Sequence, residues 1–252
     1  MSRGRLWLVP NALDLGSETV DIQDVLALGV LTQAAQIQHW VVENAKTSRA
    51  FLKRVAAVTP LVCPLQEMHI VELPRPPKDG SPAPDSRQMT ALLAPALAGA
   101  DIGLLSEAGL PAVADPGANL VAVAHAAGLA VMPMSGPSAL TLALAASGLN
   151  GQSFAFVGYL PANDPARMQR LRELEQRSRR EQQTQIAIET PYRNEALMAA
   201  LLAHLAPGTR LCVACGLTLA GGWCRTLSVE QWRTAPPSID RKLPTVFLWL
   251  AN

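Results

Sequence analysis

The segment SEAGLPAVADPG, residues 106–117, constrains this chain more than any other stretch of its sequence. It holds two carboxylates, two glycines and two prolines, and an apolar run, Ile102–Leu105, leads into it. An Ala- and Val-rich run, residues 118–127, follows it. The pattern predicts a buried strand, a rigid loop, and a helix that begins where the loop closes. In α/β proteins such a junction, at the carboxyl end of a strand, is where small molecules bind.

Strand-like and helix-like patterns alternate through the rest of the chain. The expected strands are residues 5–9, 40–42, 102–105, 130–134, 153–157, 185–188, 210–214 and 246–250. The expected helices are residues 22–31, 43–55, 89–97, 118–127 and 196–205, with two more inside the segments 135–149 and 158–180. This alternation predicts an α/β fold. We place a domain boundary just after the strand at 130–134, which predicts two α/β domains, residues 1–134 and 135–252.

Two of the expected helices carry a recognisable start. Ser135 or Gly136 can cap the helix that follows the strand at 130–134, with Pro137 in its first turn. Asn163 or Asp164 can cap the later, Arg-rich helix in the same way. Both helices are therefore expected to begin at these residues.

The charge balance and the cysteine content exclude several classes of protein. Lys and Arg total 21 against 20 Asp and Glu, so no global charge favours nucleic acid or a membrane surface. The four cysteines do not form the dense framework of a disulfide-rich secreted chain. Cys212 and Cys215 have CxxC spacing, but on an expected strand and without a second pair, so we expect neither redox chemistry nor a metal site. We expect a cytoplasmic protein, because no signal peptide and no unbroken run of about 20 apolar residues is visible.

Several expected strands end in small residues, which let a ligand approach the backbone closely. These loops are residues 10–16, 106–117, 135–138, 189–190 and 215–216, and the Pro-rich segment 72–86 is a further expected surface loop. Two of them run into helix starts, near Asp115 and Gly136, where free N–H groups can hold a carboxylate or a phosphate. Each loop alone is explained by a tight turn, but together they predict a site for a zwitterionic or anionic small molecule. No dinucleotide fingerprint or P-loop lies where a strand meets a helix, which argues against an NAD or ATP enzyme.

The motifs SEAGLPAVADPG, SGPSA, FVGYLP and IETPYRN occur in this order along the chain. Their order resembles the tetrapyrrole methylase superfamily of S-adenosylmethionine-dependent methyltransferases. Within it, the chain is most similar to the branch of ribosomal RNA small-subunit methyltransferases I, which 2′-O-methylate a cytidine of 16S ribosomal RNA. The resemblance extends from Leu8 to Thr190, and more weakly to the last strand. It implies two α/β domains with the cofactor, S-adenosyl-L-methionine, in the cleft between them, and a homodimer.

The resemblance also implies which residues hold the cofactor, largely through their backbone groups. They are Pro10, Ser106, Glu107, Ala108, Asp115, Ser135, Gly136, Pro137, Ser138, Glu189, Thr190, Ala214, Cys215, Gly216 and Leu217. A hydroxyl acceptor would benefit from a general base. Glu107 is the leading candidate, although it could instead bind loop N–H groups, and Glu43 is an alternative. Asp115 is expected to cap the next helix rather than act as the base, and Glu189 to bind ribose hydroxyls or to pair with Arg193.

Basic and aromatic residues are candidates for binding the substrate. They are Tyr192, Arg193, Arg49, Arg167 and Arg170. Arg167 and Arg170 belong to the Arg-rich helix expected within residues 158–180, and such a cluster either follows a phosphate backbone or forms a solvated helix face. Ribosomal RNA or a small ribosomal subunit would fit these charges, and so would the carboxylates of a tetrapyrrole.

Some loops depart from the pattern of the branch. The first loop reads PNALDLGS at residues 10–17, where the branch has T-P-I-G-N-L-G-D, and ENAKTSR at residues 43–49 replaces E-D-T-R. Glu107 stands where the branch has Asp. The leading hypothesis is a methyltransferase that acts on RNA, by resemblance at a ribosomal RNA ribose. A methyltransferase of a tetrapyrrole or other small molecule, and a non-catalytic S-adenosylmethionine-binding module, are the alternatives.

Overall fold

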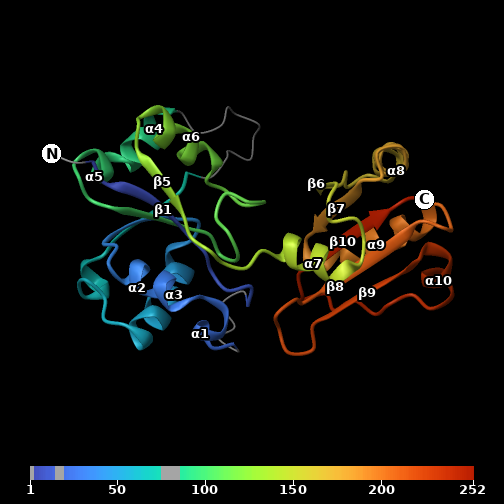
Figure 1. Cartoon of the computed structure of the whole chain (residues 1–252), viewed down its shortest axis with the longest axis horizontal. Helices are drawn as coiled ribbons and strands as arrows, with labels where there is room; N and C mark the ends of the chain where they lie inside the picture. The colour runs from blue at the N-terminus through green and yellow to red at the C-terminus, as the bar shows by residue number, and fades with distance from the viewer. Residues whose placement is uncertain (1–2, 15–19, 75–85) are drawn as a thin grey trace. The chain divides into compact units, whose positions relative to one another are not determined.

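The computed structural model of this chain describes residues 3–14, 20–74 and 86–252 (Figure 1). The chain divides into two compact units, Met1–Ser138 and Ala139–Asn252, called here the N-terminal and C-terminal units. Each unit has a five-stranded sheet with helices packed on both faces, so the predicted α/β fold is confirmed. Parts of the predicted first loop and of the Pro-rich loop lie outside the described residues.

The sheet of the N-terminal unit is parallel throughout. Its strands are β1 (Arg5–Val9), β2 (His39–Val42), β3 (His69–Glu72), β4 (Ile102–Leu105) and β5 (Ala130–Pro133), in the order β3-β2-β4-β1-β5. One face is covered by α1 (Ile22–Val25), α2 (Leu28–Ala35) and α3 (Ala45–Val58), and the other by α4 (Ser86–Leu92), α5 (Ala94–Leu97) and α6 (Ala118–Ala126), while η1 (Leu65–Glu67) precedes β3 (Figure 1). Because the strands run the same way, the loops that follow them lie along one edge of the sheet.

The sheet of the C-terminal unit is mixed. Its strands are β6 (Phe154–Tyr159), β7 (Thr184–Glu189), β8 (Arg210–Cys215), β9 (Trp223–Ser228) and β10 (Thr245–Leu250), in the order β6-β7-β10-β8-β9. The central strand β10 runs antiparallel to both β7 and β8. Helix α7 (Ala139–Ser147) covers one face, and α8 (Asp164–Glu181), α9 (Asn194–His204) and α10 (Val229–Thr234) cover the other, while η2 (Pro191–Arg193) precedes α9.

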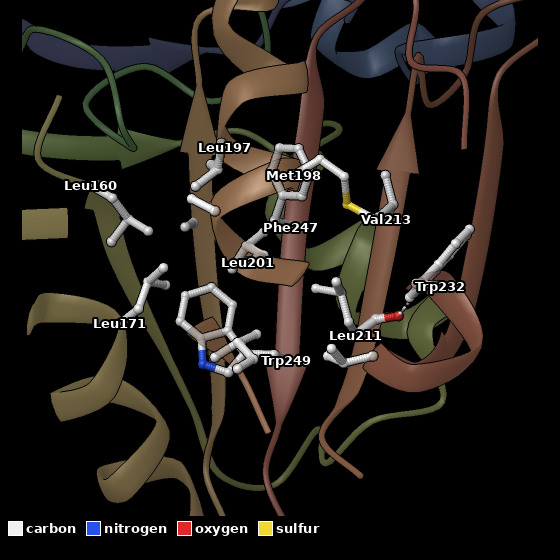
Figure 2. Packing of buried hydrophobic residues seen from close by; sticks show 14 of the residues in the cluster. Leu160, Leu171, Leu197, Met198, Leu201, Leu211, Val213, Trp232, Phe247 and Trp249 are labelled. Carbon is white, nitrogen blue, oxygen red and sulfur yellow. Dashed lines mark hydrogen bonds between the residues drawn. The ribbon is translucent and has the colours of Figure 1, made fainter. Parts of the chain in front are cut away.

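The larger core of the C-terminal unit forms where α9 meets the sheet. Leu197 and Leu201 lie on one face of α9 and cluster with Phe247 and Trp249 of β10 (Figure 2). All four side chains are at most 1% exposed, and burying a side chain of this size contributes about 1.5–3 kcal/mol. Helix α10 joins the same core through Trp232, whose Nε1 donates a hydrogen bond to the carbonyl of Leu211 at 2.8 Å (Figure 2).

Helix α8 begins where the sequence predicts. The Asn163 side chain accepts a hydrogen bond from the N–H of Ala166 at 3.0 Å, and a proline occupies the first turn, so the predicted cap is confirmed. Leu171 and Leu174 are buried against the sheet. Five arginines of α8 are exposed, whereas the side chain of Arg167, one turn before Leu171, is only 12% exposed. The sequence pattern therefore predicted both the start and the buried face of this helix.

Three expected helices differ in the structure. The helix expected at 22–31 is two helices, α1 and α2, and the one expected at 89–97 is divided into α4 and α5, because Pro95 begins a new helix. Helix α7 starts only at Ala139, so the prediction that Ser135 or Gly136 caps it is wrong. Strands β3 and β9 and helix α10 were not predicted.

Candidate functional site

Asn11 joins the loop after β1 to the loop after β4. The N–H of Asn11 donates to the carbonyl of Gly109 at 2.9 Å, and the N–H of Gly109 donates back at 3.1 Å. The Asn11 side chain donates through Nδ2 to the carbonyls of Ser106 at 3.3 Å and Glu107 at 3.0 Å. Its Oδ1 accepts from the N–H of Ala12 at 2.8 Å. Because Asn11 is only 7% exposed, these bonds fix the start of the loop at 106–117. The sequence patterns did not identify Asn11 as a site residue.

Three carboxylates gather where β2 and β4 end. Glu43 follows β2, and its Oε2 accepts a hydrogen bond from the N–H of Glu107, directly after β4, at 3.1 Å. Burial, and to a smaller extent the charges of Glu43 and Glu107, together raise the pKa of Asp115 to about 7. Among the described residues, none of the three forms an ion pair. The cluster therefore carries negative charge that no cation of the described chain balances.

Asp115 has a different role from the one its position in the sequence predicts. The N-cap of α6 is Gly117, whose φ of +130° favours glycine. No side chain caps this helix, so the prediction that Asp115 is its cap is wrong. Asp115 instead borders a cavity of about 220 Å³ that is otherwise lined largely by apolar side chains, including Leu73, Met89 and Leu120. This apolar surrounding is the physical reason for the desolvation of its carboxyl group.

The loops after β1, β4 and β5 pack closely on one another. A Cβ on Gly136 would lie 2.1 Å from the Cβ of Pro10, so only glycine fits at this position. Gly109 has a φ of +68°, and a Cβ there would lie 3.4 Å from the carbonyl oxygen of Pro137. Within the same group of loops, Ser106 is 3% exposed, and its Oγ has no hydrogen-bond partner among the described residues. A buried hydroxyl of this kind is available to a ligand.

In the C-terminal unit, Glu189 ends β7 and is held by an ion pair. Its Oε2 lies 2.6 Å from Nη2 of Arg193, and its Oε1 accepts from the N–H of Thr190 at 2.8 Å. The hydrogen bond to Glu189 raises the pKa of Arg193. From the sequence, Glu189 is expected either to bind ribose hydroxyls or to pair with Arg193, and the structure contains the pair with Arg193. Glu189 is only 7% exposed. Tyr192, in contrast, is 70% exposed.

The loop after β8 begins at Gly216, directly after two buried residues of the strand. Ala214 and Cys215 are at most 1% exposed, and Gly216 follows with a φ of +59°. The N–H of Gly216 donates to the carbonyl of Pro244 at 2.9 Å, which ties this loop to the start of β10. Asn194 also contacts the start of β10, because its Nδ2 donates to Thr245 Oγ1 at 3.0 Å. The Oδ1 of Asn194 is buried and has no hydrogen-bond partner among the described residues.

The predicted substrate-binding arginines are partly engaged within the chain. Arg167 pairs with Asp164, and Arg170 lies 3.3 Å from Glu173, both on α8. Arg49 of α3 donates to the carbonyl of Ala45 at 3.3 Å. Both pairs on α8 lie at i, i+3 spacing, but the Arg170 side chain is 44% exposed whereas that of Arg167 is only 12% exposed.

The structure thus forms two groups of predicted site residues, one in each unit. The N-terminal group contains Pro10, Ser106, Glu107, Ala108, Asp115, Ser135, Gly136, Pro137 and Ser138, and the C-terminal group contains Glu189, Thr190, Ala214, Cys215, Gly216 and Leu217. Within the described ranges there is no group of three or more His, Cys, Asp or Glu residues that could hold a metal ion. None of the described helices is both long and apolar enough to cross a membrane.

Comparison with known proteins places this chain among methylases. The family model described as Tetrapyrrole (Corrin/Porphyrin) Methylases matches residues 25–222. The chain is 45% identical over 97 residues to Ribosomal RNA small subunit methyltransferase I of Vibrio cholerae. This alignment covers 38% of this chain and 32% of that protein. It is 40% identical over 127 residues to the protein of the same name from Synechocystis, covering 50% of this chain and 44% of that protein. These alignments thus span less than half the length of each relative.

Solved structures share the fold of the whole chain. The uroporphyrin-III C-methyl transferase of Thermus thermophilus, crystallised with S-adenyl homocysteine, matches with a TM-score of 0.53 at 17% identity, covering 98% of this chain and 97% of that one. The methyltransferase CobJ matches with a TM-score of 0.58 at 16% identity, covering 98% of this chain and 94% of that one. At these identities the likeness shows the fold, in agreement with the α/β architecture predicted from the sequence.

Proposed function

Because this chain belongs to the tetrapyrrole (corrin/porphyrin) methylase family, we propose that it is an S-adenosylmethionine-dependent methyltransferase. We propose RNA as its substrate, with a ribose 2′-hydroxyl of ribosomal RNA as the acceptor. The observation that carries the proposal is the unbalanced carboxylate cluster of the N-terminal unit, together with the unpartnered hydroxyl of Ser106 beside it. The names of the relatives from Vibrio cholerae and Synechocystis support RNA as the substrate class.

The residues of the N-terminal group fit S-adenosylmethionine in their chemistry. The cofactor has a sulfonium and an ammonium group, and Glu43, Glu107 and Asp115 provide negative charge without a cation of the described chain to balance it. The Ser106 hydroxyl can donate to the cofactor's polar end, and the bare backbone at Gly136 leaves room for close approach. When bound, S-adenosylmethionine supplies a methyl group that is already activated for displacement.

We propose the following roles for the residues of this chain. Cofactor contacts come from Pro10, Ser106, Glu107, Ala108, Asp115, Ser135, Gly136, Pro137, Ser138, Glu189, Thr190, Ala214, Cys215, Gly216 and Leu217, and substrate contacts from Tyr192, Arg193, Arg49, Arg167 and Arg170. Alignment of acceptor and donor then accounts for most of the rate enhancement. Glu107 accepts the proton of the acceptor hydroxyl as this oxygen is methylated. We further propose a cytoplasmic homodimer.

Transfer of tritium from methyl-labelled S-adenosylmethionine tests the proposal. Purified chain is incubated with deproteinised ribosomal RNA and with small ribosomal subunits, and the label in RNA is counted. We expect the wild-type chain to label one of these substrates and Glu107→Gln to do so at least about 100-fold more slowly. Glu67→Gln, an exposed carboxylate of the same unit, is the matched control and is expected to keep full activity.

The outcomes separate three functions. Absence of label in both RNA substrates, with label in a tetrapyrrole or another small molecule from a cell extract, would overturn RNA as the substrate. Calorimetric binding of S-adenosylhomocysteine without transfer to any acceptor would instead indicate a non-catalytic binding module. Mass spectrometry of nucleosides from the labelled RNA identifies the methylated atom.

A further inference from the structure

Two thiols approach each other in the C-terminal unit, outside every role assigned above. Sγ of Cys212 on β8 lies 3.4 Å from Sγ of Cys224 on β9. In the antiparallel register Cys212 is opposite Thr226, and Cys224 is opposite Ala214, so the two cysteines are diagonal neighbours on one face of the sheet. Both belong to the cluster of side chains beneath α7.

This pair differs from the CxxC spacing visible in the sequence. Cys215 lies an odd number of residues after Cys212 on the same strand, so their side chains point to opposite faces of the sheet. Cys215 accordingly packs in the core formed with α8, α9 and α10, whereas Cys212 faces α7. The fourth cysteine, Cys63, belongs to the N-terminal unit.

We propose that Cys212 and Cys224 form a reversible disulfide when the protein meets a peroxide. Thr226, opposite Cys212, ties β9 to α7, because its Oγ1 donates to the carbonyl of Ser147 at the end of α7 at 2.6 Å. The sulfur atoms need to approach from 3.4 Å to about 2 Å for the bond to form.

The oxidation proceeds in two balanced steps. Cys224, which is partly exposed, is oxidised by hydrogen peroxide to a sulfenic acid, and one water is released as the O–O bond breaks. The Cys212 sulfur then attacks the Cys224 sulfur, an S–S bond forms, and the hydroxyl group leaves with the Cys212 proton as a second water. Two thiols are thereby oxidised and one peroxide is reduced, and an external dithiol reverses the bond.

The order of these steps follows from the surroundings of the two thiols. Burial raises the pKa of Cys212 to about 12, a hydrogen bond with Thr226 opposes this rise, and the neighbouring Cys224 thiol adds to it. Cys212 is fully buried whereas Cys224 is partly exposed, so peroxide reaches Cys224 first. Cys212 is the resolving cysteine and Cys224 the one that meets the oxidant.

The disulfide would close a short loop, residues 213–223, between its two cysteines. This loop contains Cys215, Gly216 and Leu217, to which the proposed function assigns cofactor contacts, so this consequence rests on that function. A bridge across β8 and β9 restricts the backbone freedom of the loop, which Gly216 and Gly221 supply through positive φ angles. Oxidation is therefore expected to change cofactor affinity.

Peptide mass spectrometry of the full chain tests the disulfide independently of methyl transfer. Reduced protein is treated with hydrogen peroxide, remaining thiols are alkylated, and the chain is digested without reductant. We expect a peptide pair linked through Cys212 and Cys224 in most molecules, lighter by two hydrogen atoms, and its loss after dithiothreitol treatment. Sulfinic acid at Cys224 with an alkylated Cys212 would overturn the proposal, and so would a linkage through Cys215 or Cys63.

Matched variants and a binding measurement complete the test. Cys224→Ser and, separately, Cys212→Ser are each expected to abolish the linked peptide, whereas Cys63→Ser keeps it. Calorimetry with S-adenosylhomocysteine is expected to show at least about a fivefold difference in affinity between oxidised and reduced chain. Equal affinities with the linked peptide present would overturn the coupling to the loop. Absence of binding in both forms would contradict the proposed function instead, while the linked peptide still supports the disulfide.

Discussion

At the carboxyl edge of the N-terminal sheet, Glu43, Glu107 and Asp115 share a site in which the pKa of Asp115 is raised to about 7. At the end of β7 in the C-terminal unit, Glu189 lies 2.6 Å from Arg193 and accepts further hydrogen bonds from Thr190. Among the described residues, the three carboxylates of the N-terminal cluster thus have no ion-pair partner, whereas Glu189 of the C-terminal unit has one. Unbalanced charge weakens a fold, and its presence is a sign of selection for binding or proton transfer. We therefore propose that the polar end of a cationic ligand binds at the N-terminal group, whereas the pairing of Glu189 with Arg193 mainly stabilises the structure.

Neutralising one carboxylate in each unit is the strongest test of this difference. Glu189→Gln weakens the hydrogen bonds of a buried carboxylate but leaves behind a partly exposed Arg193, so it is expected to lower the free energy of unfolding by about 1.5 kcal/mol. Glu107→Gln removes a charge from a cluster of like charges and is expected to leave that free energy unchanged or raise it by about 0.5 kcal/mol. Urea unfolding followed by tryptophan fluorescence measures both. Equal losses in the two variants would contradict the contrast.

Glycine positions test whether the loops of the N-terminal group are packed as closely as described. Gly136→Ala places a Cβ 2.1 Å from the Cβ of Pro10 and is expected to cost about 2 kcal/mol of stability, because the loops must separate. Gly151→Ala in the C-terminal unit meets no atom within 4 Å and serves as the control. We expect thermal unfolding to show a lower midpoint for the first variant only. Comparable unfolding midpoints for Gly136→Ala and Gly151→Ala would show that the loop after β5 can move away from Pro10 at little cost in stability.

The pH dependence of stability is a smaller and more specific effect. The pKa of Asp115 is raised from 3.8 to about 7, so the folded chain binds a proton more tightly than the unfolded chain does. Its contribution to stability is complete below about pH 4 and is lost as the pH rises through 7. Allowing for solvent screening of this half-buried group, we expect a loss of about 1 kcal/mol between pH 5 and pH 8. Urea midpoints measure it.

The variant Asp115→Asn provides the control for this slope. The asparagine does not titrate, so the difference between the two pH values should be smaller than in the wild-type chain by about 1 kcal/mol. An identical slope in both proteins would assign the pH dependence to other groups. Deprotonation of Asp115 should also make binding of a cationic ligand tighter above pH 7. Calorimetry at pH 5 and pH 8 can detect this difference in affinity.

The arginines of α8 give the smallest expected change in stability. Arg170 and Glu173 are both exposed, so Arg170→Ala should change the free energy of unfolding by less than about 0.5 kcal/mol. If α8 binds an RNA backbone, Arg170→Ala should weaken RNA binding. It should also reduce the slope of log affinity against log salt concentration by about 1, the change expected for the loss of one phosphate contact. Filter binding at several salt concentrations measures this. An unchanged salt dependence would mean that this face is only solvated.

Strands and helix starts were predictable where neighbouring residues in the sequence determine them. The apolar run Ile102–Leu105 is a strand with the predicted bounds, because all four residues are buried and polar or small residues bound it. The Asn163 cap was predictable because the cap, the following proline and the buried leucines are all near neighbours in sequence. Strand β3 was not, since most of its residues are exposed and show no apolar pattern. Its position is set by hydrogen bonds to β2.

The candidate site was predictable as a set of loops but not in its detailed contacts. Parallel strands bring their carboxyl ends together, so Pro10, Ser106 and Gly136 were correctly placed in neighbouring loops. The hydrogen bonds of Asn11 depend on the register between β1 and β4, which no local pattern encodes. Asp115 was misassigned as a cap because Gly117 takes that position through a φ that only the folded loop reveals.

The place of β10 in its sheet has a consequence for the order in which this protein folds during synthesis. β10 follows β6 to β9 in sequence, yet it lies between β7 and β8 and pairs with both. Until residues 245–250 have emerged from the ribosome, these two strands lack their shared partner, and the apolar side chains around Phe247 have no core. The N-terminal unit is complete by Ser138 and can fold while the remainder is translated. The C-terminal unit must wait, and its nascent strands are then exposed to chaperones and to aggregation.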